Sequence, residues 1–226
     1  MTTTVNMIGS GAIGRPVATW LGANSGFALQ DILRRDTTAW RPAELSIDTA
    51  GPDALRQYGP RLLRQGELWS VGAVALADDA FREEMAAIAA ATGHRLRLFT
   101  GWIGGIGLHP VSQAASLHVE QSAPGLGERP GIVFDGPLRE ALQRFPHHLN
   151  TACAAALCGP GIDNTTVRLS CTEPGAPHVI SATLETASDR HVSSVTMLVG
   201  QPGIMHPVAA AIIAALERRG KWLGYG

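Results

Sequence analysis

The sequence contains no apolar run of about 18 residues, the length that a membrane-spanning helix needs, and its start has no basic segment followed by an apolar stretch. Charge is also scarce, since only 16% of the 226 residues are charged and the formal net charge is -1. Without a basic patch there is no electrostatic basis for binding nucleic acid or an anionic membrane surface. We therefore expect a globular, cytoplasmic protein whose partners are small molecules.

Cysteine is scarce as well, because the three residues Cys153, Cys158 and Cys171 are odd in number and include no C-x-x-C pair. This argues against a disulfide framework and against a structural zinc site. The eight histidines lack the i, i+4 spacing with a carboxylate that is typical of a zinc-binding helix, and the adjacent His147 and His148 would point in two directions on a helix. We expect no metal and three reduced, buried thiols.

Apolar strands and amphipathic helices alternate along the N-terminal half of the chain. This order predicts an α/β fold with a mostly parallel sheet, because parallel neighbours require helical crossovers. The predicted strands are 3–8, 27–33, 45–50, 68–74 and 95–100, and the predicted helices are 15–21, 52–65 and 78–92.

A G-x-G-x-x-G motif lies between the first strand and the first helix, the context in which it indicates dinucleotide binding. The first glycine permits a tight turn, the second lets the backbone approach a pyrophosphate, and the third allows the helix to pack closely on the strand. The free N–H groups of the helix N-terminus suit phosphate. The sequence thus predicts a Rossmann domain whose cofactor contacts include Gly9, Ser10, Gly11, Ala12, Ile13 and Gly14.

The residues at the end of the second strand indicate whether the cofactor ribose carries a free 2′-hydroxyl or a 2′-phosphate. A carboxylate there would bind a free 2′-hydroxyl, whereas this chain has Arg34 and Arg35, whose guanidinium groups suit a 2′-phosphate. We therefore favour NADP, with NAD as the alternative because Asp36 follows closely. The arginine pair also has a purely structural interpretation as a solvated strand end.

The pattern changes after Val111, where strands predominate. Predicted antiparallel strands cover 116–121, 166–172, 178–186 and 192–199, and predicted helices cover 137–145, 150–157 and 207–219. The sequence thus predicts a C-terminal α+β domain with a largely antiparallel sheet. We expect the dinucleotide-binding domain to span 1–106 with a returning helix at 207–222, and the α+β domain to span 107–206.

Four further segments make the chain resemble the aspartate dehydrogenase family across nearly its whole length. They are Asp48–Pro52, Ser70–Ala73, Thr100–Gly105 and Phe145–Asn150, which match an acidic-Ala-Ala-Ser stretch, a Ser-x-Gly-Ala strand end, a Ser-Gly-Ala-Ile-Gly-Gly turn and a Phe-Pro-x-Asn-x-Asn segment. The resemblance implies reversible oxidative deamination of a small amino acid and a homodimer formed through the second domain. It also adds to the cofactor site the residues Ala50, Ser70, Gly72, Trp102 and Asn150.

The family's catalytic histidine matches His178, which follows a polar stretch and begins a predicted strand. A residue that donates and accepts a proton near neutral pH is needed to activate water on an iminium, and histidine suits that task. On pattern alone, a single histidine on a strand is more often structural, so its catalytic role is what the resemblance implies.

The chain departs from the family where the substrate would bind. The family's Asn-Pro-x-Thr-Ser stretch is replaced by His206, Pro207, Val208, Ala209 and Ala210, and a large indole at Trp102 stands where alanine is usual. His147, His148 and His206 are the candidate substrate-binding residues. Two alternatives remain: an imine or carbonyl reductase with a different substrate, and a non-catalytic NADP-binding sensor, because a fold alone does not fix the chemistry.

Overall fold

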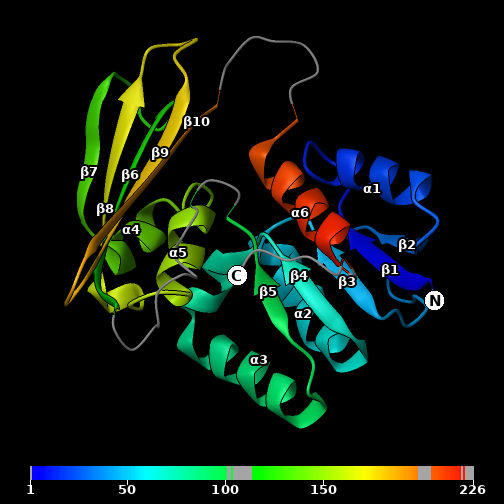
Figure 1. Ribbon diagram of the computed structural model, residues 1–226. Helices are drawn as coiled ribbons and strands as arrows, with labels where there is room; N and C mark the ends of the chain where they lie inside the picture. The colour runs from blue at the N-terminus through cyan, green and yellow to red at the C-terminus, as the bar shows by residue number, and fades with distance from the viewer. Residues whose placement is uncertain (1, 101–102, 104–113, 198–204, 220, 222–226) are drawn as a thin grey trace. The chain divides into compact units, whose positions relative to one another are not determined.

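The computed structural model describes residues 2–100, 103, 114–197, 205–219 and 221 (Figure 1). These residues form two units, one containing the described residues up to 99 and from 208 onward, and the other containing those from 100 to 207. The domain boundary predicted near residue 106 lies outside the described residues. Each unit has its own five-stranded sheet.

The sheet of the first unit is entirely parallel, in the order β2-β1-β3-β4-β5. Its central strand β3 is buried at all 4 positions, as is typical of a parallel sheet covered on both faces. The strands are β1 (Thr3–Ile8), β2 (Phe27–Leu33), β3 (Leu45–Asp48), β4 (Glu67–Ser70) and β5 (Leu96–Leu98).

Helices flank this sheet, with α1 and α6 on one face and α2 and α3 on the other (Figure 1). They are α1 (Gly14–Ala23), α2 (Pro52–Gln65), α3 (Asp79–Thr92) and α6 (Pro207–Arg218), and a short 3-10 helix, η1 (Ala73–Ala77), precedes α3. The ends of α3 follow its sequence, because Asp78 accepts a hydrogen bond from the Phe81 N–H at 3.2 Å and Gly93 adopts the left-handed φ of 72°.

Three strands of the first unit end earlier than the sequence predicts. Strand β5 ends at Leu98 instead of residue 100, and β3 and β4 end at polar side chains. The strand predicted over 45–50 ends at Asp48, whose carboxylate accepts the N–H groups of Ala50 and Gly51 and turns the chain. The strand predicted over 68–74 ends at Ser70, whose hydroxyl accepts the Gly72 N–H at 2.9 Å. In both cases a side chain takes backbone donors that a longer strand would pair with its neighbour.

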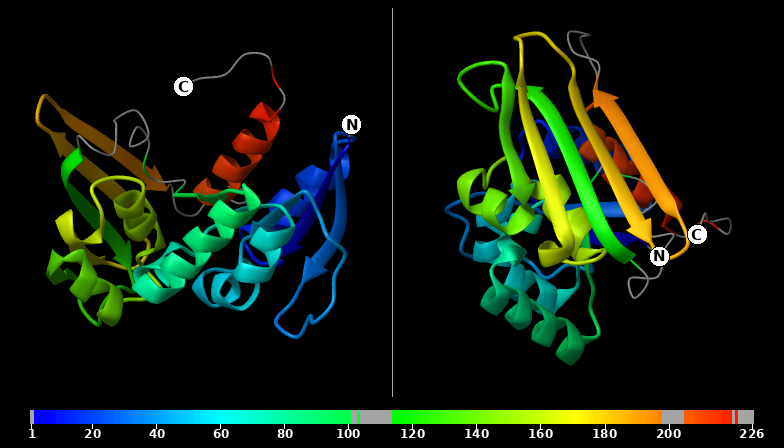
Figure 2. Two further views of the ribbon diagram at one scale, coloured as in Figure 1. Left: turned by 90° about the horizontal axis from the view of Figure 1, so that it is seen from below. Right: turned by 90° about the vertical axis from the view of Figure 1, so that its left-hand side faces the viewer.

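The second unit contains a mixed sheet in the order β10-β9-β6-β8-β7, whose strands are seen side by side in Figure 2 (right). The strands are β6 (Ala114–Pro124), β7 (Gly131–Pro137), β8 (Thr165–Thr172), β9 (His178–Thr186) and β10 (Arg190–Met197). All neighbours are antiparallel except β6 and β8, which are parallel. The prediction that β8 is only antiparallel was therefore wrong for one of its two edges, because alternation defines the face of a residue and not the partner of its strand. Strand β7 was missed, because Gly131 and Gly136 interrupt its apolar pattern.

One face of this sheet is apolar. Val119, Val167 and Ala182 are all at most 3% exposed and lie opposite one another in register. Helices α4 (Leu138–Arg144) and α5 (Asn150–Leu157), with the 3-10 helix η4 (Ile162–Asn164), belong to the same unit, and α4 packs on β7 and β8. The predicted fold class, a Rossmann-type α/β domain followed by a largely antiparallel α+β domain, is confirmed.

The cysteine prediction holds for two of the three thiols. Cys153 and Cys171 are buried, whereas Cys158 is exposed because it follows the last residue of α5. No helix within the described part of the chain is long and apolar enough to cross a membrane.

Candidate functional site

The turn between β1 and α1 meets the structural demands that the motif predicts for its first and last glycines. Gly9 adopts φ +88°, which side chains rarely tolerate. A Cβ on Gly14 would lie 2.5 Å from the Gly9 carbonyl oxygen and 2.6 Å from Thr49 Oγ1, so only glycine lets α1 begin this close to β1. Gly11 has open space where a Cβ would stand, with no atom within 4 Å.

The start of α1 is suited to an anion. No side chain caps this helix, and no acidic residue lies in its first turn. The partial positive charge of a helix N-terminus and its N–H groups therefore face no competing carboxylate from the helix itself. Ser10, Gly11 and Ala12 are exposed in the same turn. The turn thus fits the pyrophosphate of a dinucleotide.

A second group of residues supports the turn from the carboxyl end of β3. Thr49 Oγ1 donates to the Ile8 carbonyl at 2.8 Å and lies 3.3 Å from the Gly9 carbonyl. Asp48, next to it, accepts hydrogen bonds from Ala50, Gly51 and Ser70. Burial raises the pKa of Asp48 to about 6, although these three donors act in the opposite direction.

The predicted cofactor residues Ala50, Ser70 and Gly72 are therefore brought together at the carboxyl ends of β3 and β4. A Cβ on Gly72 would lie 2.7 Å from the carbonyl carbon and oxygen of Gly51, so these two loops touch through their backbones. In open parallel sheets, ligands bind outside the carboxyl ends of the strands, and this is the edge that also carries the glycine turn.

The turn after β2 holds Arg34 and Arg35 by their backbones. Tyr58 of α2 donates its hydroxyl hydrogen to the Arg34 carbonyl, and Gln57 Nε2 donates to the Arg35 carbonyl at 2.9 Å. Both arginine side chains are exposed, and neither pairs with a carboxylate of the described residues. The turn is thus fixed while its two guanidinium groups stay available to a ligand.

In the second unit, His178 is the first residue of β9 and lies opposite Met197 of β10. Because side chains alternate along a strand, His178 shares a face with the buried Ile180 and Ala182, which is the apolar face of the sheet. The imidazole is half-buried. Burial lowers its pKa, and the positive charges of His206 and His148 lower it further, so the neutral imidazole is favoured.

The structure therefore places two of the three predicted substrate residues within electrostatic reach of His178. His206 is half-buried and its own pKa is lowered by burial, while His148 is exposed in the loop before α5. His147 is exposed in the same loop. Asn150 begins α5. Trp102 lies outside the described residues.

Sequence reasoning missed three polar residues of these two regions. Asp48 and Thr49 were quoted only as part of a family segment, although an acidic residue directly after an apolar strand is a signal for a polar strand end. Gln121 of β6 is 4% exposed on the same sheet face as His178, and its Oε1 has no hydrogen-bond partner within the described residues. A polar residue at an inward position of an alternating strand was the available signal.

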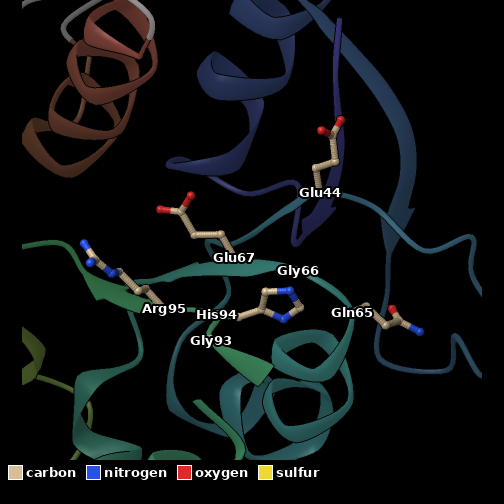
Figure 3. Close-up of a pocket in the computed structure, with 7 residues that line it drawn as sticks. All are labelled: Glu44, Gln65, Gly66, Glu67, Gly93, His94 and Arg95. Carbon is tan, nitrogen blue, oxygen red and sulfur yellow. The ribbon is translucent and has the colours of Figure 1, made fainter. Parts of the chain in front are cut away.

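A cleft of about 450 Å³ lies at the opposite edge of the first sheet, beside the amino ends of β4 and β5 (Figure 3). Glu67 at this cleft already pairs with Arg219 at 2.6 Å and accepts the Trp69 indole N–H at 2.6 Å. The residues that line it are Glu44, Gln65, Gly66, Glu67, Gly93, His94 and Arg95. It contains none of the residues predicted for the cofactor. No cluster of three or more metal-ligating side chains occurs among residues whose placement is described.

Comparison with known proteins gives matches to aspartate dehydrogenases. A family model described as aspartate dehydrogenase, C-terminal, matches residues 109–218. L-aspartate dehydrogenase of Ruegeria pomeroyi is 33% identical over 199 residues, which is 78% of this chain and 72% of that protein. L-aspartate dehydrogenase 2 of Bordetella bronchiseptica is 35% identical over 150 residues, 58% of this chain, and the match spans only 56% of that relative.

Solved structures give the same fold. The aspartate dehydrogenase of Thermotoga maritima has a TM-score of 0.81 at 20% identity and covers 100% of both chains. A hyperthermophilic archaeal homoserine dehydrogenase in complex with NADPH has a TM-score of 0.59 at 9% identity and covers 96% of this chain and 97% of that one. At these identities the likeness concerns the fold alone.

Proposed function

The chain belongs to the aspartate dehydrogenase family, and we propose that it is a nicotinamide-dependent amino-acid dehydrogenase. Its reaction would be the reversible oxidative deamination of L-aspartate or a related small amino acid, with reductive amination of an oxaloacetate-like keto acid as the reverse. The observation that carries the proposal is the combination, in one chain, of a glycine turn leading into a helix N-terminus without a side-chain cap and a half-buried histidine whose pKa is lowered. Each lies at a position that the family resemblance implies.

NADP is the proposed cofactor, with NAD as the alternative. The glycine turn with Gly9, Gly11 and Gly14 would hold the pyrophosphate, and Arg34 and Arg35 would bind a 2′-phosphate. Ala50, Ser70, Gly72, Asn150 and Trp102 are the remaining residues proposed for this site. When bound, the nicotinamide ring accepts the hydride that leaves Cα of the amino acid.

His178 is the proposed acid–base group. Its lowered pKa leaves the imidazole neutral near pH 7, so that it can accept a proton from the water that adds to the iminium carbon. The protonated imidazole then returns this proton to the amine nitrogen of the carbinolamine. The C–N bond breaks as the hydroxyl-bearing carbon becomes the carbonyl, and the hydroxyl proton goes to the departing ammonia, which leaves as ammonium. Overall, amino acid, oxidised cofactor and water give keto acid, ammonium and reduced cofactor, with one proton released.

The substrate carboxylates would be bound by imidazole N–H groups instead of the hydroxyls usual in the family. His206 and His148 are close enough to His178 to affect its pKa, and His147 neighbours His148. Ala209 is 0% exposed, and thus the position where the family carries a hydroxyl is packed into the core here. This departure favours a second candidate, an imine or carbonyl reductase that acts on a less polar substrate.

The remaining proposals concern assembly and location. The face of the second sheet opposite His178 carries polar and charged side chains, among them Glu120 and Arg168, whose side chains pair at 3.5 Å. We propose, from the family, that residues 1–106 with 207–222 form the dinucleotide-binding domain and that residues 107–206 form the catalytic domain, through which the protein dimerises. We also propose that the protein is cytoplasmic.

The test is a titration of the purified protein with NADPH and NADH, followed by oxaloacetate and ammonia while the absorbance of the reduced cofactor is recorded. Consumption of reduced cofactor supports the dehydrogenase, and consumption with other carbonyl substrates only supports the reductase. His178→Ala should abolish turnover and leave the cofactor dissociation constant within about twofold of wild type. Binding without turnover by any substrate would contradict both and leave a non-catalytic NADP-binding sensor.

A further inference from the structure

Asp48 is the most heavily hydrogen-bonded buried carboxylate at the carboxyl edge of the first sheet. It is 1% exposed. Its Oδ1 accepts the N–H groups of Ala50 at 2.8 Å and Gly51 at 3.2 Å, and its Oδ2 accepts the Ser70 hydroxyl hydrogen at 2.6 Å. A carboxyl group that accepts three hydrogen bonds and donates none has the bonding pattern of the ionised form.

The hydrogen bonds continue from Asp48 into both neighbouring loops. Ser70 Oγ also accepts the Gly72 N–H at 2.9 Å, and Gly72 lies against the backbone of Gly51. Asp48 is therefore the shared acceptor that joins the loop between β3 and α2 to the loop between β4 and η1. Thr49, the next residue in the chain, donates to the Ile8 carbonyl and lies beside the Gly9 carbonyl.

Stability does not explain an ionised carboxylate at this place. Burial outweighs the three donors and raises the pKa of Asp48 to about 6, so ionisation is disfavoured by the fold. The charge near neutral pH thus destabilises the folded state relative to a neutral side chain. Arrangements that cost stability are concentrated at functional sites.

We propose that ionised Asp48 is a positioning residue for the nicotinamide cofactor. By holding the two loops together, it keeps Thr49 and the Gly9 turn in the arrangement that receives the dinucleotide. Asp48 does not touch the cofactor, because its oxygens are buried and already bonded to Ala50, Gly51 and Ser70. This inference rests on the proposed function, since it takes this edge of the sheet as the cofactor site.

Among the described residues, no second titratable group contributes to the pKa shift of Asp48. In register, β1 presents Ile8 and β4 presents Ser70 to this position. Helix α2 carries Asp53 and Arg56, both exposed, and neither contributes to the pKa shift of Asp48. Tyr58 of α2 directs its hydroxyl to the Arg34 carbonyl. A pH-dependent change centred on this network therefore belongs to Asp48.

The experiment measures dissociation constants of NAD⁺ and NADP⁺ by calorimetry from about pH 5 to about pH 8, a range that spans the titration of a group near pH 6. NAD⁺ is included because the 2′-phosphate of NADP⁺ itself titrates at about pH 6. We expect wild-type affinity for both to fall as the pH drops through the titration of Asp48. Asp48→Asn should bind both dinucleotides on the order of tenfold more weakly at neutral pH, because charge-assisted hydrogen bonds are lost, and its NAD⁺ affinity should show no step in that range.

Two further variants separate positioning from a general loss of charge or structure. Ser70→Ala should move the step to higher pH, because the Ser70 hydroxyl lowers the pKa of Asp48. Asp53→Asn, the matched loss of an exposed carboxylate in the first turn of α2, should keep the wild-type profile. A step in NAD⁺ affinity that is retained in Asp48→Asn, or an unmoved NAD⁺ midpoint in Ser70→Ala, would overturn the inference while the proposed function stands. A wild-type protein that binds neither dinucleotide at any pH would overturn both.

Discussion

Replacing Gly14 by alanine should destabilise the first unit through one identifiable clash. The new Cβ would lie 2.5 Å from the Gly9 carbonyl oxygen, 2.6 Å from Thr49 Oγ1 and 3.0 Å from the Gly9 carbonyl carbon. The threonine could rotate, but the carbonyl belongs to a backbone turn that Gly9 fixes at φ +88°. Relief therefore requires α1 to move away from β1, and overpacking of this kind costs about 1–3 kcal/mol.

The matched control is Gly22→Ala in the same helix. Gly22 is exposed and has no atom within 4 Å of the position of a Cβ. Alanine is favoured over glycine in a helix by up to ~1 kcal/mol, so this variant should be as stable as wild type or more stable. Urea unfolding of the three proteins gives the comparison, with the denaturant slope as the check that the transition itself is unchanged. If Gly14→Ala unfolds at the same urea concentration as Gly22→Ala, the close approach of α1 to β1 is wrong.

Two predictions concern charge. The double variant Arg34→Ala, Arg35→Ala should weaken NADPH binding by about 10- to 100-fold and change NADH binding less than about twofold, because each charged hydrogen bond contributes about 1.5–3 kcal/mol before solvent screening. The control is Arg56→Ala, which removes an exposed arginine of α2. Equal losses of affinity for both cofactors would contradict the proposed binding of the 2′-phosphate by Arg34 and Arg35. Burial raises the pKa of Asp48 to about 6, above its ordinary value of 3.8, so the folded state binds this proton more tightly than the unfolded state. The stability that the bound proton contributes is fully present below the unfolded pKa and is lost as the pH rises through the folded pKa. The contribution of Asp48 to the free energy of unfolding should therefore fall by about 2 kcal/mol between about pH 4 and about pH 6, and urea unfolding of Asp48→Asn should lack this contribution.

The sequence predicted the elements of the first unit well because their signals are local. The helix over 52–65 and the strand over 27–33 match α2 and β2 residue for residue, since a proline begins the helix and turn residues bound the strand. Strand β7 was missed because its Gly131 and Gly136 break the apolar alternation. The parallel pairing of β6 with β8 was not predictable from alternation, because it depends on which strand enters the sheet beside which.

The errors at the ends of β3 and β4 and the omission of Asp48 from the site have one physical cause. The sequence predicted that two strands continue past Asp48 and Ser70, because the residues that follow are small or apolar. In the structure these two side chains take the backbone donors of Ala50, Gly51 and Gly72, and the strands stop there. The same bonds create the loops at the carboxyl edge of the sheet, where we propose that the cofactor binds. A polar residue at the end of a short buried strand therefore indicates both where the strand ends and where a site is formed. Strand propensity alone predicts neither.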